Sequence, residues 1–291
     1  MKQRVITAMV LLAVLAVVVW QIYTPLFIIV IAFLSAVASN EIMKCAKISN
    51  KFLIIAGTIV AALIPFTASA SVLEPWVSKE IWIQVICFFP SISGLVVLLI
   101  AYLLSMLKGY SHTKFEDVAI AVMASVVVPY GFSVFGMLRD FYGIATQTGI
   151  YFIFYGLICA LATDVGAQLG GMAFGKTKMS PNISPKKTVE GAVCGIVTSM
   201  IFNSIALVLY NRFAEASLDM TTAGVLLGLS PVVSFLGMMG DLSASILKRN
   251  FGVKDFGKIF PGHGGVMDRF DSTLFTIPTT YFIVTMIDKL F

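Results

Sequence analysis

Residues 241–271 read DLSASILKRNFGVKDFGKIFPGHGGVMDRFD and form a polar segment in a chain that is otherwise mostly apolar. The segment gathers aspartates, lysines and arginines together with one of the only two histidines of the chain. A metal ion needs hard oxygen ligands, and a polyphosphate needs cations and backbone N–H groups. This concentration of acids and bases therefore indicates a site for a metal ion and a polyphosphate.

The apolar remainder of the chain decides the fold class. Of the 291 residues, 58% are hydrophobic and 12% are charged, which leaves too little polar surface to cover a soluble globule. The long apolar stretches lack the alternation of barrel strands. The sequence predicts an all-α, polytopic integral membrane protein of about nine spans. Their predicted ranges are 5–23, 25–39, 52–70, 84–107, 117–138, 149–171, 188–210, 222–247 and 270–288.

The lysines and arginines predict the orientation, because cytoplasmic loops retain positive charge. With these nine spans, 16 of the 20 lysines and arginines fall on the side of the N-terminus, and the exceptions are Lys79, Arg139, Arg212 and Lys289. The N-terminus and residues 241–271 are thus predicted to be cytoplasmic, in a cell (inner) membrane. This bias, helped by anionic membrane lipid, accounts for the net charge of +5 without a nucleic-acid partner.

The two parts of the chain differ in polar content. Residues 1–110 contain almost no ionisable group within the predicted spans, so we expect them to serve packing, lipid contact or a dimer surface. Residues 111–291 are predicted to form the catalytic membrane region, with cytoplasmic loops at 172–190 and 248–269. Asp164 and Asp241 lie within predicted spans, where a carboxylate is costly unless it faces a partner or a wet cavity. Both are site candidates, and a purely structural ion pair is the alternative.

Two features of the 172–190 loop have competing interpretations. Residues 170–177 (GGMAFGKT) match a P-loop pattern, but an apolar helix precedes them and prolines follow, so we reject that fold. Lys186 and Lys187 either mark topology and contact lipid headgroups or bend back to neutralise a phosphate.

Spacing within 241–271 predicts a cation site. Asp241 and Ser245 are four residues apart, and Asp268 and Asp271 are three apart, so on helices each pair shares a face. Two such helix ends would supply an oxygen-rich cage for Mg²⁺. Between them, residues 261–265 (PGHGG) have little side-chain bulk, and their backbone can approach phosphate oxygens. The sequence displays no Ser-His-Asp or Cys-His arrangement for covalent catalysis.

Residues 245–249 (SILKR), 254–257 (KDFG) and 261–271 (PGHGGVMDRFD) resemble the signature of the phosphatidate cytidylyltransferases, also called CDP-diacylglycerol synthases. A looser resemblance covers residues 164–175 and 183–191. The family often has tryptophan where Val189 stands, and many members have an acid where Ala244 stands. The resemblance implies transfer of the cytidylyl group of CTP to phosphatidate, giving CDP-diacylglycerol and pyrophosphate. It implies Mg²⁺, allows a second monovalent cation such as K⁺, and favours a homodimer.

The resemblance also implies residue roles. The expected metal ligands are Asp241, Asp268 and Asp271, with Ser245 as an auxiliary oxygen ligand. The residues expected to bind nucleotide or the phosphatidate headgroup, or to line the site, are Asp164, Lys248, Arg249, Lys254, Gly264, Gly265 and Arg269. Lys187 is expected to close over the phosphates, and His263 to shape the loop or donate to a phosphate.

Two other functions stay open at this point. Acids within spans would also suit a secondary transporter, although the chain shows no internal repeat and its charges gather on one side of the membrane. A CTP-dependent enzyme acting on another lipid phosphate, as a transferase or a kinase, would carry a similar polar segment.

Overall fold

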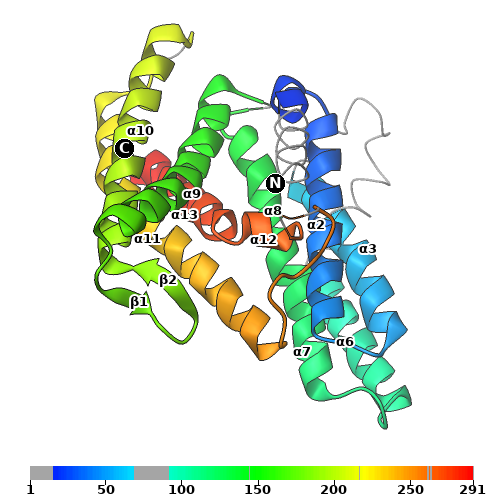
Figure 1. Cartoon of the computed structure of the whole chain (residues 1–291). Helices are drawn as coiled ribbons and strands as arrows, with labels where there is room; N and C mark the ends of the chain where they lie inside the picture. The colour runs from blue at the N-terminus through cyan, green and yellow to red at the C-terminus, as the bar shows by residue number, and fades with distance from the viewer. Residues whose placement is uncertain are drawn as a thin grey trace. The chain divides into compact units, whose positions relative to one another are not determined.

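The computed structural model describes residues 16–68, 92–143, 145–215, 217–260, 262 and 264–290. The chain forms two compact units (Figure 1). The first unit comprises Met1–Met137 and Val253–Arg269, and the second comprises Leu138–Gly252 and Phe270–Phe291. Each unit is thus assembled from two separate stretches of sequence.

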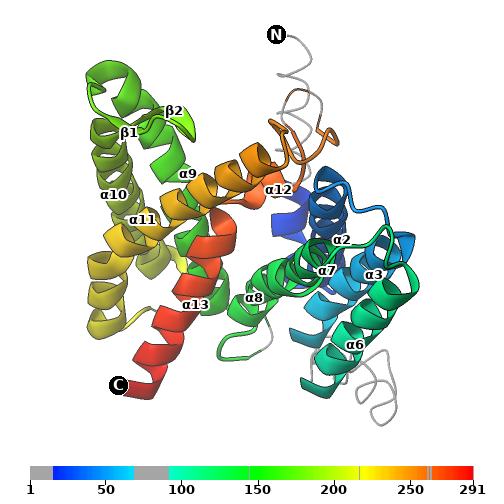
Figure 2. The same cartoon turned by 90° about the horizontal axis from the view of Figure 1, so that it is seen from below.

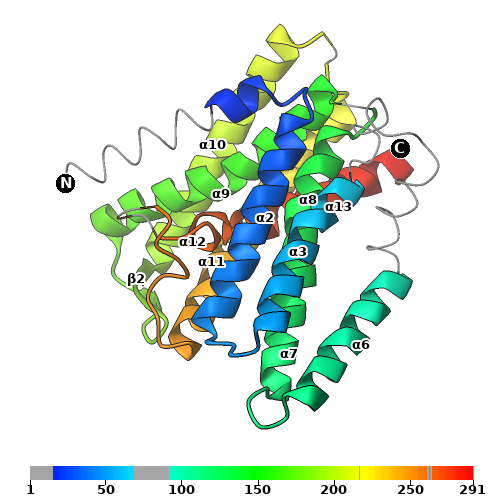
Figure 3. The same cartoon turned by 90° about the vertical axis from the view of Figure 1, so that its right-hand side faces the viewer.

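The first unit is a bundle of helices. Its elements are α2 (Leu26–Cys45), α3 (Lys51–Ala68), α6 (Ile92–Lys108), α7 (Phe115–Val122), the π-helical turn η1 (Met123–Val127) and most of α8 (Val128–Arg139). Helix α2 packs against α3 (Figures 2 and 3), and η1 packs against both. The buried Ser35 hydroxyl donates to the Ala61 carbonyl oxygen at 2.7 Å, which ties α2 to α3. Polar bonds of this kind join helices in an apolar environment, where apolar contact alone discriminates little.

The π-helical turn has a local cause. It ends directly before α8, whose second residue is Pro129. Proline has no N–H to donate to the preceding turn, so the regular ladder is interrupted there. A single π turn inside a longer helix is the usual form of such an interruption.

The second unit contains the longest helices among the described residues. Its elements are α9 (Gln147–Phe174), β1 (Lys178–Ser180), β2 (Ser184–Thr188), α10 (Val189–Phe213), α11 (Met220–Asn250) and α13 (Thr273–Leu290). The short helix α12 (Met267–Phe270) crosses the boundary between the units. Side chains of Thr146, Thr188 and Asp219 cap the N-termini of α9, α10 and α11, which satisfies N–H groups that have no helical partner.

Glycines allow α9 and α10 to pack at close range. A Cβ at Gly166 of α9 would lie 2.5 Å from Thr198 Oγ1 of α10. A Cβ at Gly191 or Gly195 of α10 would lie 2.6 Å from the carbonyl oxygen of Ala167 or Thr163 respectively. Small residues at a spacing of four are typical of helix contacts in membranes. Gly166, Gly191 and Gly195 therefore let the backbones of α9 and α10 approach closely.

The strands correct the all-α prediction. β1 and β2 form an antiparallel hairpin that pairs Lys178 with Thr188. The prolines at 181 and 185 prevent a helix here, and we had expected only a loop. The Glu190 carboxylate accepts the N–H groups of Lys176 and Thr177 at 3.1 Å, which closes the base of the hairpin. This long-range use of Glu190 could not be foreseen from spacing alone.

Helices lie in most of the predicted span ranges, and the count of nine spans stays a prediction. The predicted span 5–23 lies mostly outside the described residues, and each of the other ranges contains a helix. Among the described residues, five helices are long and apolar enough to cross a membrane: Leu26–Cys45, Phe115–Arg139, Gln147–Phe174, Val189–Phe213 and Met220–Asn250. Lys51–Thr67 and Ser93–Lys108 are shorter apolar helices. The protein is therefore a mostly helical, multi-pass membrane protein.

The packing of α9 against α10 generates the first testable prediction. We expect Gly195→Ala to lower the free energy of unfolding by about 1–3 kcal/mol, because the added methyl group meets a backbone carbonyl that cannot move freely. The matched control is Gly228→Ala on α11, where no described atom lies within 4 Å of an added Cβ. The control should change stability by at most about 1 kcal/mol, in the stabilising direction.

Thermal unfolding of both variants in detergent measures this difference. Equal transition temperatures for Gly195→Ala and Gly228→Ala would show that the two helices do not pack as closely as the structure has them.

Candidate active site

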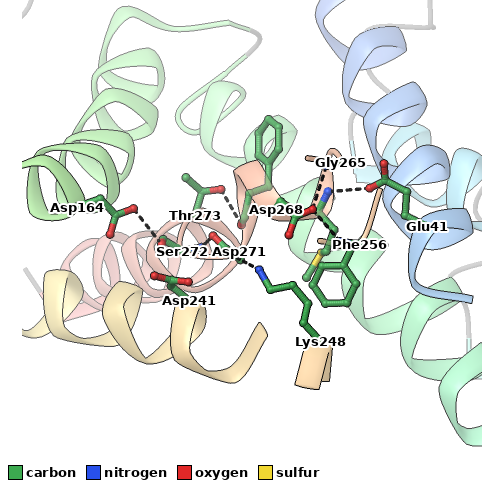
Figure 4. Close-up of polar contacts among 12 residues, drawn as sticks. Glu41, Asp164, Asp241, Lys248, Phe256, Gly265, Asp268, Asp271, Ser272 and Thr273 are labelled. Atoms are coloured by element: carbon green, nitrogen blue, oxygen red, sulfur yellow. Dashed lines mark hydrogen bonds and ion pairs between the residues drawn. The ribbon is translucent and has the colours of Figure 1, made fainter. Parts of the chain in front are cut away.

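Three carboxylates gather in the second unit. Asp164 comes from α9, Asp241 from α11, and Asp271 from the turn that precedes α13. The Asp271 side chain is 11% exposed and is close enough to Asp241 and Asp164 for their charges to interact. The Ser272 hydroxyl donates to Asp164 Oδ2 at 3.3 Å, and the Ser272 N–H donates to Asp271 Oδ1 at 2.9 Å. Figure 4 shows the three acids around Ser272.

Two lysines compensate these charges. Lys187 Nζ lies 2.5 Å from Asp241 Oδ2, and Lys248 Nζ lies 3.8 Å from Asp271 Oδ2. The Lys187 nitrogen is buried, and no described atom accepts a hydrogen bond from it in good geometry. Its contact with Asp241 is thus an ion pair that leaves donor capacity unused. The cluster therefore combines hard oxygen ligands with ammonium groups that can bind phosphate.

The hairpin determines the position of Lys187. Lys187 is the penultimate residue of β2, directly before the N-cap residue Thr188, whose hydroxyl accepts the Gly191 N–H at 3.1 Å. At the same end of the hairpin, Glu190 holds the residues that precede β1 by accepting the N–H groups of Lys176 and Thr177. The neighbouring Lys186 is exposed. Of the two adjacent lysines, the structure directs Lys187 to Asp241, and its role toward a phosphate stays a prediction.

Asp268 belongs to the loop of the first unit. Its Oδ2 atom accepts the N–H groups of Phe256 at 2.8 Å and Gly265 at 2.9 Å. Gly264 has a φ of +87°, and an added Cβ there would lie 2.8 Å from the same oxygen. Phe260 donates its N–H to the Gly264 carbonyl oxygen at 3.0 Å. Asp268 therefore organises the glycine-rich loop, a function that the i, i+3 spacing with Asp271 did not predict.

The other predicted site residues are placed as follows. Ser245 is half-buried on α11, one turn after Asp241, and Arg249, Lys254 and Arg269 are exposed. His263 lies outside the described residues. Within the described part of the chain, no group of three or more histidine, cysteine, aspartate or glutamate side chains is arranged to hold a metal ion. The four-ligand metal set expected from the sequence therefore stays a prediction.

The donor chemistry still fits Mg²⁺. This ion is usually held by one or two carboxylates, and its remaining positions are filled by water and substrate phosphate oxygens. Asp241 and Asp271 provide such a pair of carboxylates, and both face ammonium groups. A protein site with only two carboxylates is therefore sufficient when a polyphosphate is the substrate.

Sequence reasoning missed Glu41. The predicted second span ends at residue 39, but α2 continues to Cys45. Glu41 is 6% exposed, and it accepts the N–H groups of Val266 and Met267 at 3.1 and 3.0 Å. The helix continues because the loop satisfies this carboxylate. One feature of the sequence could have indicated this role: Glu41 lies close to an apolar span, where an acid without a partner is costly.

These features define a multi-pass membrane protein with a polar site suited to phosphate chemistry. The chain belongs to the cytidylyltransferase family, because the model described as "Cytidylyltransferase family" matches residues 2–287. It is therefore a nucleotidyltransferase.

Three relatives illustrate the similarity, and each is named phosphatidate cytidylyltransferase. The Staphylococcus aureus (strain COL) protein is 36% identical over 197 residues, which cover 68% of this chain and 69% of the relative. The Bacillus subtilis (strain 168) protein is 36% identical over 191 residues, 66% of each chain. A Staphylococcus epidermidis protein is 34% identical over 279 residues, 96% of each chain. The similarity to this last protein extends over almost the whole length of the chain.

Proposed function

We propose that the protein transfers the cytidylyl group of CTP to phosphatidate, giving CDP-diacylglycerol and pyrophosphate in phospholipid synthesis. The observation that carries the proposal is the cluster of Asp164, Asp241 and Asp271 with Lys187 and Lys248, in a chain of the cytidylyltransferase family. Acids of this kind also suggested a secondary transporter, and family membership does not favour that class. A CTP-dependent enzyme for another lipid phosphate is the remaining alternative.

The chemistry requires positioning more than proton transfer. A phosphatidate phosphate oxygen, already ionised, attacks the α-phosphorus of CTP in line, and the bond to the leaving pyrophosphate breaks. Such reactions depend on alignment and on neutralisation of charge on the phosphoryl oxygens. No general base is needed at the attacking oxygen, so the expected contribution of His263 is to the loop or to phosphate binding.

The chain offers cations for this purpose. We expect Lys187 and Lys248 to exchange their carboxylate partners for phosphate oxygens when substrate binds, since the Lys187 ammonium has unused donors. Arg249, Lys254 and Arg269 are exposed and are proposed to hold the triphosphate or the lipid headgroup. The backbone of Gly264 and Gly265 is proposed to approach the nucleotide phosphates.

A Mg²⁺ ion is part of the proposal. Asp241 and Asp271 would hold it, and Ser245 and Asp268 stay predicted additional ligands. When bound, the ion would neutralise phosphate charge. A second, monovalent cation such as K⁺ is proposed by resemblance only.

The membrane arrangement is also a proposal in its finer detail. The nine proposed spans follow from the long apolar stretches. The charge bias of the loops supports a cytoplasmic N-terminus and a site that faces the cytoplasm. The acyl chains of phosphatidate would stay in the cell (inner) membrane, because extraction into water costs about 0.8 kcal/mol per CH₂. A homodimer is proposed on the family resemblance.

Pyrophosphate release tests the proposed reaction. The purified protein in detergent, with Mg²⁺ and phosphatidate, should release pyrophosphate when CTP is supplied and not when ATP is supplied. Release should also require phosphatidate, because the lipid phosphate is the nucleophile. No release by a folded protein with either nucleotide would contradict the proposal, and release with CTP and a different lipid phosphate alone would favour the alternative transferase.

Lys187 supplies a second prediction. We expect Lys187→Ala to raise the KM for CTP or phosphatidate about tenfold or more, because a charged hydrogen bond to phosphate is lost. The matched control is Lys186→Ala, which removes the adjacent exposed lysine and should change KM by no more than about twofold. Steady-state kinetics of the two variants, each with an unchanged thermal transition, measure the difference. Unchanged KM values in Lys187→Ala would contradict phosphate binding by Lys187 and would favour the interpretation that it marks membrane topology and contacts lipid headgroups.

A further inference from the structure

Glu41 is a buried acid that the proposed reaction does not use. Its side chain lies on α2, and the residue is 6% exposed. Its two carboxylate oxygens accept separate backbone bonds, Oε1 from the Val266 N–H at 3.1 Å and Oε2 from the Met267 N–H at 3.0 Å. Both donors are themselves buried and lie 225 and 226 residues away in sequence. The carboxylate therefore connects a membrane helix to the loop that carries the family signature.

Two glycines of the loop make room for this carboxylate. A Cβ at Gly257 or at Gly265 would overlap the Glu41 carboxylate oxygens. Neither glycine has a backbone φ that only glycine adopts readily, so conformation alone does not explain them. The space that the Glu41 side chain occupies explains both glycines. Figure 4 shows the Glu41 carboxylate beside Gly265. The loop is thus shaped around this acid from two sides.

Glu41 and Asp268 together organise one loop. Asp268 accepts the N–H groups of Phe256 and Gly265, and Glu41 accepts those of the next two residues, Val266 and Met267. Three consecutive N–H groups of the loop therefore point to carboxylates. The Cys45 thiol, one turn after Glu41 on α2, also donates to the Phe256 carbonyl oxygen at 2.9 Å. This arrangement fixes the backbone next to Gly264 and Gly265.

The cost of burying a carboxylate argues that it serves more than stability. A buried charge with two hydrogen bonds is seldom more stabilising than an apolar side chain of similar volume. Buried charged groups are common where a binding site needs a precise geometry, and their hydrogen-bond partners then fix them in place. The loop that Glu41 holds is the one proposed to approach the phosphates of CTP.

We propose that Glu41 is a positioning residue for nucleotide binding: its carboxylate fixes the backbone of residues 264–267 so that Gly264 and Gly265 meet CTP. This inference rests on the proposed function. It predicts that Glu41 affects the use of CTP and not the use of phosphatidate.

The first measurement is amide hydrogen exchange of the loop in Glu41→Gln. Glutamine keeps the size of the side chain but offers one acceptor oxygen for two N–H groups. We expect exchange of the Val266 and Met267 amides to accelerate by about tenfold or more, because a bond to a charged acceptor is lost. The matched control is Ser39→Ala, which alters a buried residue of the same helix whose hydroxyl has no hydrogen-bond partner among the described residues. The control should exchange like the unmodified protein.

The second measurement is kinetic and separates positioning from mere stability. In Glu41→Gln the KM for CTP should rise about tenfold, because the backbone groups that meet the phosphates are no longer held in place. The KM for phosphatidate should stay within about twofold, and so should both values in Ser39→Ala. Gly257→Ala provides a second variant, since its methyl group overlaps the Glu41 carboxylate and would also lie 2.9 Å from the Gly265 Cα atom, and it should change loop exchange and the KM for CTP in the same directions.

The outcomes are distinguishable. Wild-type exchange at Val266 and Met267 in both Glu41→Gln and Gly257→Ala would overturn the proposal, whatever the enzyme's activity. Faster exchange with an unchanged KM for CTP would overturn the positioning role and leave Glu41 structural. No pyrophosphate release by the unmodified protein would refute the proposed function and with it the link to CTP, whereas the exchange result would still decide whether Glu41 holds the loop.

Discussion

Carboxylates removed from water impose the main constraint on this structure, since each must find N–H groups or cations close by. In the first unit, Glu41 and Asp268 meet this need with backbone N–H groups of one loop. In the second unit, Asp241 and Asp271 meet it with Lys187 and Lys248. These hydrogen bonds and ion pairs hold the polar segments of an otherwise apolar chain in place.

The two kinds of partner, backbone N–H groups and lysine ammonium groups, suit different roles for the carboxylates that they hold. Backbone N–H groups cannot move away from a carboxylate without a change of the backbone itself, so Glu41 and Asp268 hold the loop in place. Lysine ammonium groups sit on flexible stems and can be shared with a phosphate that arrives. The acids that face lysines are therefore the ones proposed to meet substrate and metal, and Glu41, which is held by backbone N–H groups, is proposed to position the loop. This difference separates Asp241 and Asp271 from Glu41 within a sequence that contains few acids.

Particular residues show how far the sequence could predict the structure. The apolar stretches predicted the helices well, because a span must satisfy its own backbone, and short spacing brought Asp241 and Ser245 onto one helix face. The hairpin at 178–188 depends on Glu190 accepting N–H groups 13 and 14 residues away, and spacing rules do not extend that far. Glu41 was overlooked for the same reason, since its partners are more than two hundred residues distant. Asp268 was expected to ligate metal. Its hydrogen bonds to the loop depend on the backbone conformation of residues 256 and 265, which residue spacing does not predict.

The central claim is that Asp241 and Asp271 form the cation-binding pair of a CTP-dependent site. The Mg²⁺ dependence of pyrophosphate release by Asp271→Asn tests it most directly, with Ser243→Ala on the exposed side of α11 as the control. We predict that the half-saturating Mg²⁺ concentration rises about tenfold or more in Asp271→Asn, because one of two charged ligands is lost, and that the control is unchanged. A Mg²⁺ dependence and a turnover equal to those of the unmodified protein would contradict the account.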